Sequence, residues 1–325
     1  MSMTTATPQQ VSVVVPFLNE LDNLPELYGR LNAMAQARSE SFEFIFVDDG
    51  SSDASPQWVV DCAQQDPRVK MIRLSRNFGH QIAITAGLDL AEGDAVIVMD
   101  ADLQDPPEVI PDLLAKWAEG YQVVYAVRAS REGETWTKKF LAAAFYKVFF
   151  YFAEVKVPMN TGDFRLVDRR VVRALRQVRE VHRYVRGLTS WAGFTQCAVS
   201  YNRAARHAGE TKYPVWKSAK LAWDAVTSFS GKPLRLMTGI GSLVALIGVL
   251  VAMKVIAGKI LHPESLVPGW ATLVAVVLFL GGLQLACLGL VGQYVGRIFE
   301  ESKKRPLYIV RETVGLPERA DEGNK

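Results

Sequence analysis

Two long stretches without a charged residue, both in the last third of the chain, constrain its fold more than any other feature. Leu236 to Met253 and Ser265 to Gly296 contain no Asp, Glu, Lys or Arg. A helix needs about 20 apolar residues to cross the hydrocarbon core of a bilayer. We therefore predict two transmembrane helices, at residues 233–256 and 266–296. A buried hairpin of a soluble domain is the alternative.

The basic residues around these stretches are unequally distributed. The loop between the stretches carries Lys254 and Lys259, and Glu264 opposes them. The outer flanks hold more positive charge, at Lys232, Arg235, Arg297, Lys303, Lys304 and Arg305. Because basic loops stay on the cytoplasmic side, we predict a multi-pass protein of the inner (plasma) membrane with both termini in the cytoplasm.

The first two thirds of the chain alternate between two hydrophobic patterns. Apolar runs such as Val11 to Val15 end in polar turn residues, as parallel strands covered on both faces do. Segments such as Asn23 to Ala37 have apolar residues at helical spacing. These βα repeats predict an α/β fold, a Rossmann-like, mostly parallel sheet with helices on both faces. Ligands of such sheets bind beyond the carboxyl ends of the strands.

The predicted domain boundaries follow from these patterns. We expect a flexible N-terminus over residues 1–10, a cytoplasmic catalytic domain over 11–212 and a cytoplasmic tail over 297–325. Two segments combine aromatic stripes with lysines, about 138–157 and 213–232. Helices of this composition lie in the headgroup plane of a membrane. Packing of both stripes on the sheet is the alternative.

A pair of aspartates directly follows one of the predicted strands. Asp100 and Asp102 come after the run Val96 to Met99, and Gln104 follows two residues later. Alternate residues of an extended segment point the same way, so two carboxylates can converge on one hard cation. We therefore predict that Asp100, Asp102 and Gln104 bind Mg²⁺ or Mn²⁺, which would neutralise a departing diphosphate.

A second acidic turn follows the predicted strand at residues 42–47. Asp48 and Asp49 there can accept hydrogen bonds from a uracil N–H and from ribose hydroxyls, so we predict that they bind a nucleotide sugar. Asp53, in the same turn, is better explained as a helix N-cap. We also place Arg76 and Asn77 near the donor.

Three sequence motifs together resemble family 2 glycosyltransferases of the GT-A fold. They are Pro16-Phe-Leu-Asn-Glu20, Asp48-Asp-Gly-Ser-Ser-Asp53 and Asp100-Ala-Asp-Leu-Gln-Asp-Pro-Pro-Glu108. The similarity is greatest to the polyprenyl-phosphate branch, which includes dolichol-phosphate mannose synthase and the bactoprenol glucosyltransferases. Arg73 to His80, Thr161 to Arg165 and the paired apolar stretches favour the bacterial bactoprenol type.

The resemblance implies roles for further residues. It implies a nucleotide pocket lined by Pro16, Phe17, Asn19, Glu20 and Asp48. It also implies phosphate-facing basic residues at Arg128, Arg131, Arg206 and Lys212. The family's basic loop usually has a serine where this chain has Thr211, which keeps the hydroxyl.

Three features leave more than one interpretation open. Asp163 is expected to position the acceptor or the sugar; a general base, or an ion pair with Arg165 or a neighbour, are the alternatives. The run Arg183 to Trp191 either walls the site or packs on the sheet. The four histidines show no metal-ligand spacing, and we assign them no catalytic role.

The resemblance implies an inverting hexosyltransferase that moves a sugar, most often glucose in this branch, from a UDP-sugar to undecaprenyl phosphate. Asp102, Asp163, Arg128 and Arg131 are then the catalytic candidates. Mannose, galactose, an N-acetylhexosamine or an aminoarabinose derivative remain open as the sugar. A processive polysaccharide synthase would carry a Gln-x-x-Arg-Trp motif, which this chain lacks, and a non-catalytic scaffold would have lost its acidic motifs.

The expected partners are therefore the donor, the lipid acceptor and the bilayer. A net charge of +3 gives no indication of nucleic-acid binding. The run Pro306 to Arg311 is strand-like and lies beyond the apolar stretches, isolated from the predicted sheet. Because such a strand could pair with a neighbouring subunit, we expect a homo-oligomer.

Overall fold

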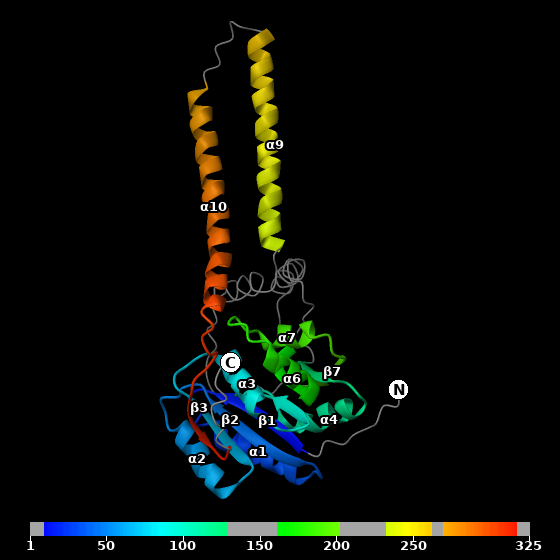
Figure 1. Ribbon diagram of the computed structural model, residues 1–325. Helices are drawn as coiled ribbons and strands as arrows, with labels where there is room; N and C mark the ends of the chain where they lie inside the picture. Colours follow the sequence, from blue (N-terminus) through cyan, green and yellow to red (C-terminus); the bar gives the residue numbers. More distant parts are fainter. Residues whose placement is uncertain (1–9, 129–160, 202–231, 262–268, 317–325) are drawn as a thin grey trace. The chain divides into compact units, whose positions relative to one another are not determined.

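The computed structural model describes residues 10–128, 161–201, 232–261 and 269–316 (Figure 1). The chain divides into two compact units. The first unit comprises residues 1–139, 155–212 and 306–325, and the second comprises residues 140–154 and 213–305. The predicted interfacial segments, 138–157 and 213–231, lie outside the described residues.

The described part of the first unit is built on an eight-stranded sheet in the order β7-β5-β6-β4-β1-β2-β3-β8. The strands are β1 (Gln10–Phe17), β2 (Ser41–Asp48), β3 (Val69–Leu74), β4 (Ala95–Val98), β5 (Val123–Arg128), β6 (Thr161–Asp168), β7 (Gln196–Tyr201) and β8 (Val310–Val314). Strands β4, β1, β2 and β3 are parallel, as the βα repeats predicted. The sheet as a whole is mixed, because β6 runs antiparallel to β4 and β5, and β8 antiparallel to β3.

Helices cover both faces of this sheet, which confirms the layered α/β arrangement (Figure 1). They are α1 (Leu24–Gln36), α2 (Ser55–Gln65), α3 (His80–Leu90), the 3₁₀ turn η1 (Pro107–Val109), α4 (Ile110–Ala118), α6 (Arg169–Gln177) and α7 (Val185–Trp191). On one face, Leu27 of α1 and Leu113 of α4 share a buried cluster with Val13 of β1. On the other face, α3 packs so closely that a Cβ on Gly87 would lie 2.2 Å from Val14.

The strand-like run after the apolar stretches belongs to the main sheet, contrary to its predicted isolation. Strand β8 pairs with β3, and the N–H of Ser75 donates to the carbonyl of Ile309 at 2.9 Å. The physical reason is that β3 would otherwise expose its backbone groups at a sheet edge. Since β8 completes its own sheet, this strand no longer supports the expected homo-oligomer.

The described part of the second unit consists of two long helices, α9 (Lys232–Leu261) and α10 (Trp270–Ser302). Each helix overlaps one predicted membrane span, although α9 ends five residues beyond residue 256 and α10 ends six residues beyond residue 296. One helix, at Phe279–Ser302, is long and apolar enough to cross a membrane, and Leu236–Val251 forms a shorter apolar stretch. The two helices contact each other, with Cys287 Sγ 4.0 Å from Met237 Sδ. Many of their apolar side chains are exposed, including Leu243, Leu246 and Phe279.

The tight packing of α3 on β1 gives a stability prediction. Gly87→Ala should lower the free energy of unfolding by about 1–3 kcal/mol, because the new methyl group would meet Val14 in a filled core. Gly29→Ala, on α1, is the matched control. No atom lies within 4 Å of a Cβ at that position, so this variant should gain about 0.5–1 kcal/mol. Chemical denaturation measures the free energy of unfolding of both variants. Equal changes in the two would contradict the close packing of α3 on β1 at Gly87.

Candidate active site

Several predicted site residues meet at one edge of the sheet. Strands β1, β2 and β4 end there, and Asp48 and Asp100 stand at or just beyond their carboxyl ends. Strand β6 starts at this edge because it runs antiparallel to β4, with Val98 opposite Arg165. Asp163 lies two residues before Arg165 and Asp100 two residues after Val98, so both stand at this edge. The topology therefore brings together two carboxylates that lie far apart in the sequence.

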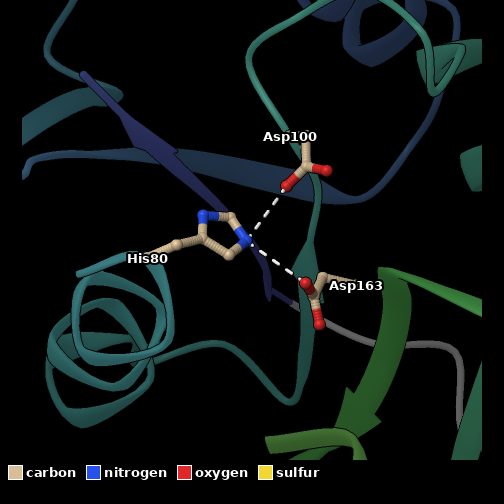
Figure 2. Close-up of side chains that lie close together, drawn as sticks. All are labelled: His80, Asp100 and Asp163. Atoms are coloured by element: carbon tan, nitrogen blue, oxygen red, sulfur yellow. Dashed lines mark hydrogen bonds and ion pairs between the residues drawn. The ribbon is translucent and has the colours of Figure 1, made fainter. Parts of the chain in front are cut away.

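His80 lies between these two carboxylates (Figure 2). Its Nε2 is 3.2 Å from Asp163 Oδ2 and 3.4 Å from Asp100 Oδ1. One ligand atom from each of the three residues lies within 4.8 Å of the others, a grouping that could hold a metal ion. Our expectation that no histidine belongs to such a grouping is therefore wrong for His80. Its position at the first residue of α3 was the missed signal, since that helix starts at the sheet's carboxyl edge.

Asp163 is held by side chains from two further positions. Arg186 on α7 donates from Nε to Oδ1 and from Nη2 to Oδ2, both at 2.8 Å. Gln81 Nε2 donates to Oδ2 at 3.3 Å. The alternative of an ion pair with a neighbour is thus realised, but with Arg186; Arg165 donates instead to the carbonyl oxygens of Asp163 and Gly162. The run Arg183 to Trp191 therefore contributes a residue to the site.

The two carboxylates have opposite electrostatic environments. Burial alone would raise the pKa of Asp163, but the hydrogen bonds from Arg186 and His80 outweigh it and hold that pKa well below its usual range. Burial, together with the negative charges of Asp163, Asp105 and Asp102, raises the pKa of Asp100 to about 6 despite His80. Burial lowers the pKa of His80, yet its bond to Asp163 and the two carboxylate charges raise it overall.

The turn after β4 holds the rest of the predicted metal-binding set. Asp102 Oδ1 accepts the backbone N–H of Gln104 at 3.2 Å, and Gln104 is buried. Leu103, between them, has a positive φ of 60°, which marks a sharp turn. Among the described His, Cys, Asp and Glu residues, the structure groups Asp100 with His80 and Asp163, without Asp102. Metal binding by Asp100, Asp102 and Gln104 stays a prediction.

The carboxylates after β2 are engaged with the protein. Asp48 is fully buried; its Oδ1 accepts the N–H of Ser51 at 2.8 Å, and its Oδ2 lies 3.2 Å from Arg73 Nε. Asp49 accepts the backbone N–H groups of Phe78 and Gly79 at 2.7 and 3.0 Å. Burial, opposed by these bonds, raises the pKa of Asp49. Asp49 thus ties down the loop before α3, and donor contacts of either carboxylate stay predictions.

The loops after β1 and β2 are joined by polar contacts. Asn19, in the left-handed region at a φ of 56°, accepts the N–H of Ser52 at 2.8 Å through its side chain. Glu20 N donates to Ser55 Oγ at 3.0 Å. Asp53 accepts the N–H of Ser55 at 3.0 Å, but the N-cap of α2 is Ala54, so the predicted N-cap at Asp53 is wrong by one residue. Pro16 and Phe17 are buried at the end of β1.

The loop that contains Arg76 and Asn77 runs against the turn after β2. A Cβ at Gly50, where φ is 81°, would lie 2.7 Å from the backbone of both residues, so only glycine allows this approach. The Arg76 guanidinium stacks on Phe78, 4.1 Å from the ring centroid. Arg128 is the last residue of β5, at the same sheet edge. The other predicted phosphate-binding residues, Arg131, Arg206 and Lys212, lie outside the described residues.

Comparison with known proteins points to one family. The family described as glycosyl transferase family 2 matches residues 12–176. An uncharacterized glycosyltransferase of Bacillus subtilis is 48% identical over 94% of this chain and 95% of its own length. A bactoprenol glucosyl transferase of Shigella phage SfV is 40% identical over 93% of this chain and 98% of its own. A prophage bactoprenol glucosyl transferase homolog of Escherichia coli has the same identity and coverage.

Among solved structures, mannosyl-3-phosphoglycerate synthase from Rubrobacter xylanophilus aligns with a TM-score of 0.46 at 17% identity. The alignment covers 70% of this chain and 74% of that one.

The raised pKa of Asp100 predicts a pH-dependent stability. The ordinary value is 3.8 and the folded value about 6, so between these pH values the folded protein binds more protons than the unfolded chain. Stability from this group therefore falls as pH rises from about 4 to about 6 and stays lower above that. Asp100→Asn removes the ionisation, so the variant should melt at a higher temperature than the parent at pH 7.5, but not at pH 4.

Asp61→Asn is the control for this measurement, because Asp61 is an exposed carboxylate on α2 that accepts a bond from Gln57. Its melting temperature should follow that of the parent across the same range. A difference between Asp100→Asn and the parent that stays constant from pH 4 to pH 7.5 would contradict the raised pKa.

Proposed function

Because the chain belongs to glycosyl transferase family 2, and is a glycosyltransferase related to the bactoprenol glucosyl transferases, we propose that it transfers a hexose from a UDP-sugar to undecaprenyl phosphate. The observation that carries this proposal is the 40% identity to a bactoprenol glucosyl transferase over 93% of the chain. Glucose is the proposed sugar, since the names of several relatives specify it.

The donor is proposed to bind at the carboxyl ends of β1, β2 and β4, the usual ligand position in such sheets and the arrangement expected of a GT-A fold. Asp48 stands at the end of β2, and its Oδ2 makes an ion pair with Arg73. The loops that carry Asn19 and Glu20 are fixed to the turn after β2. A nucleotide would therefore meet a rigid pocket wall.

The residues after β4 fit a divalent cation. Asp100 Oδ1 is buried and accepts no hydrogen bond from the described residues, although His80 Nε2 is 3.4 Å away. A buried, raised-pKa carboxylate beside other acidic groups suits a hard cation with oxygen ligands. We propose that Asp100, Asp102 and Gln104 hold Mg²⁺ or Mn²⁺, which when bound would neutralise negative charge on the leaving UDP.

The acceptor side is proposed to lie at the membrane. A phosphate on a polyprenyl tail stays in the bilayer, so an enzyme that uses it must reach headgroup depth. Helices α9 and α10 would anchor the chain as two spans, with both termini and the catalytic unit in the cytoplasm. Arg128, Arg131, Arg206 and Lys212 would bind the acceptor phosphate, and segments 138–157 and 213–232 would lie in the interface.

The proposed chemistry needs little help from a protein base. A lipid phosphate has its second pKa near about 6, so most of it is already a dianion at neutral pH. Its oxygen would attack the anomeric carbon opposite the leaving UDP, which inverts the configuration. Holding two anions together is then the main task, and Arg128 and Arg131 would contribute to it electrostatically.

Asp102→Asn tests the metal assignment. Transfer should fall by about 100-fold or more, because charge stabilisation by a bound cation contributes several kcal/mol. Membranes that contain the full chain are incubated with a radiolabelled UDP-sugar and undecaprenyl phosphate, with Mg²⁺, with Mn²⁺ or with a chelator. Labelled lipid is then counted.

Asp112→Asn is the control, since Asp112 is an exposed carboxylate in the first turn of α4. It should keep parental activity. Full activity of Asp102→Asn would overturn the metal assignment alone. If the parent chain gives no lipid-linked product with UDP-glucose or any other UDP-sugar, the proposed function itself is wrong.

A further inference from the structure

The contacts of Asp163 identify a role for Arg186, which lies in the run Arg183 to Trp191. Both Asp163 oxygens are occupied, Oδ1 by Arg186 Nε and Oδ2 by Arg186 Nη2, His80 Nε2 and Gln81 Nε2. Oδ2 therefore receives three of these contacts and Oδ1 one, and two of the four come from the same guanidinium. Asp163 is also nearly inaccessible to solvent, with 3% of its surface exposed. Its geometry is that of a fixed anion and leaves it poorly placed to accept a proton from a substrate.

Arg186 is itself positioned by the protein. Its third nitrogen, Nη1, donates to the carbonyl of Thr161 at 2.9 Å. The start of α7 is fixed by Gln81, whose Oε1 accepts the N–H of Val185 at 2.9 Å. Gln81 therefore binds α7 with one side-chain atom and Asp163 with the other. The fork of Arg186 thus approaches Asp163 in one orientation only.

The proton on His80 follows from these contacts. An ionised carboxylate only accepts hydrogen bonds, so the Nε2 that lies 3.2 Å from Asp163 carries the hydrogen. That same Nε2–H faces Asp100 at 3.4 Å. The ring orientation, and with it the group presented to Asp100, is set by Asp163.

We propose that Arg186 is a positioning residue of the transfer reaction, which acts by clamping Asp163 so that Asp163 aims the His80 ring at Asp100. Asp163 in this arrangement is a permanent anion that orients His80, and it does not serve as a general base. The expected change in kcat rests on the proposed function. The expected effect of Arg186 on the orientation of His80 does not depend on that function.

The experiment uses the full-length protein in detergent, with four variants and one control. Arg186→Met removes the clamp, Arg186→Lys keeps the charge without the two-pronged geometry, and Asp163→Asn removes the anion. The fourth variant combines Arg186→Met with Asp163→Asn. Arg179→Met is the matched control, because Arg179 also pairs with a buried aspartate, Asp89, at 2.6 Å.

Two readouts are recorded for each protein. The first is the ring ¹⁵N resonances of histidine-labelled protein, which are few because the chain contains four histidines. The His80 signals are assigned by their loss in His80→Gln. The second is kcat and the donor KM for transfer to undecaprenyl phosphate.

Arg186→Met and Asp163→Asn should each shift the His80 resonances, while Arg179→Met leaves them unchanged. Misplacement of a site group by about 1 Å costs on the order of 100-fold, so kcat should fall by about 10- to 100-fold with donor KM within about twofold. Arg186→Lys should recover part of the loss. Because both residues act as one unit, the double variant should be no slower than the slower single variant.

Parental His80 resonances in Arg186→Met would overturn the proposal, as would losses in kcat that multiply in the double variant. If Arg186→Met does not fold because it leaves Asp163 buried without its partner, the Lys variant and the double variant still give the comparison. If the parent chain transfers no sugar, the proposed function fails while the resonances still test whether Arg186 controls His80.

Discussion

The antiparallel pairing of β4 with β6 is the constraint on which the rest of the site depends. It brings Asp163, near the start of β6, close to Asp100, just beyond the end of β4, so two negative charges lie near each other. The protein compensates with positive groups from outside the sheet. His80 enters from the start of α3 and Arg186 from α7, so both helices must end up at this edge. The positions of α3 and α7 beside β6 thus bring positive groups to Asp100 and Asp163.

The compensation is unequal, and this inequality divides the work between the carboxylates. Asp163 receives the two-pronged bond from Arg186 and is kept ionised, with its pKa well below the usual range. Asp100 has the His80 ring nitrogen Nε2 at 3.4 Å from its Oδ1, and burial raises the pKa of Asp100 to about 6. Two carboxylates in different environments can take different tasks. Asp163 is thus bound on both oxygens by the protein, while Asp100 Oδ1 accepts no hydrogen bond from the described residues.

The sequence was sufficient to predict the strands and acidic turns, which depend on local pattern. It was insufficient to predict contacts between residues of distant elements, which depend on how those elements pair and pack. The alternation of apolar runs predicted the parallel strands, and the acidic turns after β2 and β4 were recognisable because each follows an apolar run. Asp163, His80 and Arg186 could not be grouped, since 83 and 23 residues separate them and they meet only through the packing of β6, α3 and α7. Strand β8 was misjudged for the same reason, because an edge strand attracts a partner regardless of the distance along the chain.

The loop before α3 connects the proposed donor pocket with this charge cluster. Asp49, the first residue after β2, accepts the N–H groups of Phe78 and Gly79, and His80 is the next residue. The position of the His80 ring is therefore fixed from two directions, through its backbone by Asp49 and through its side chain by Asp163. Because Asp49 adjoins Asp48, a movement of the turn after β2 would also move the start of α3. The turn that carries Asp48 and Asp49 is thus connected to His80 through the backbone of Phe78 and Gly79.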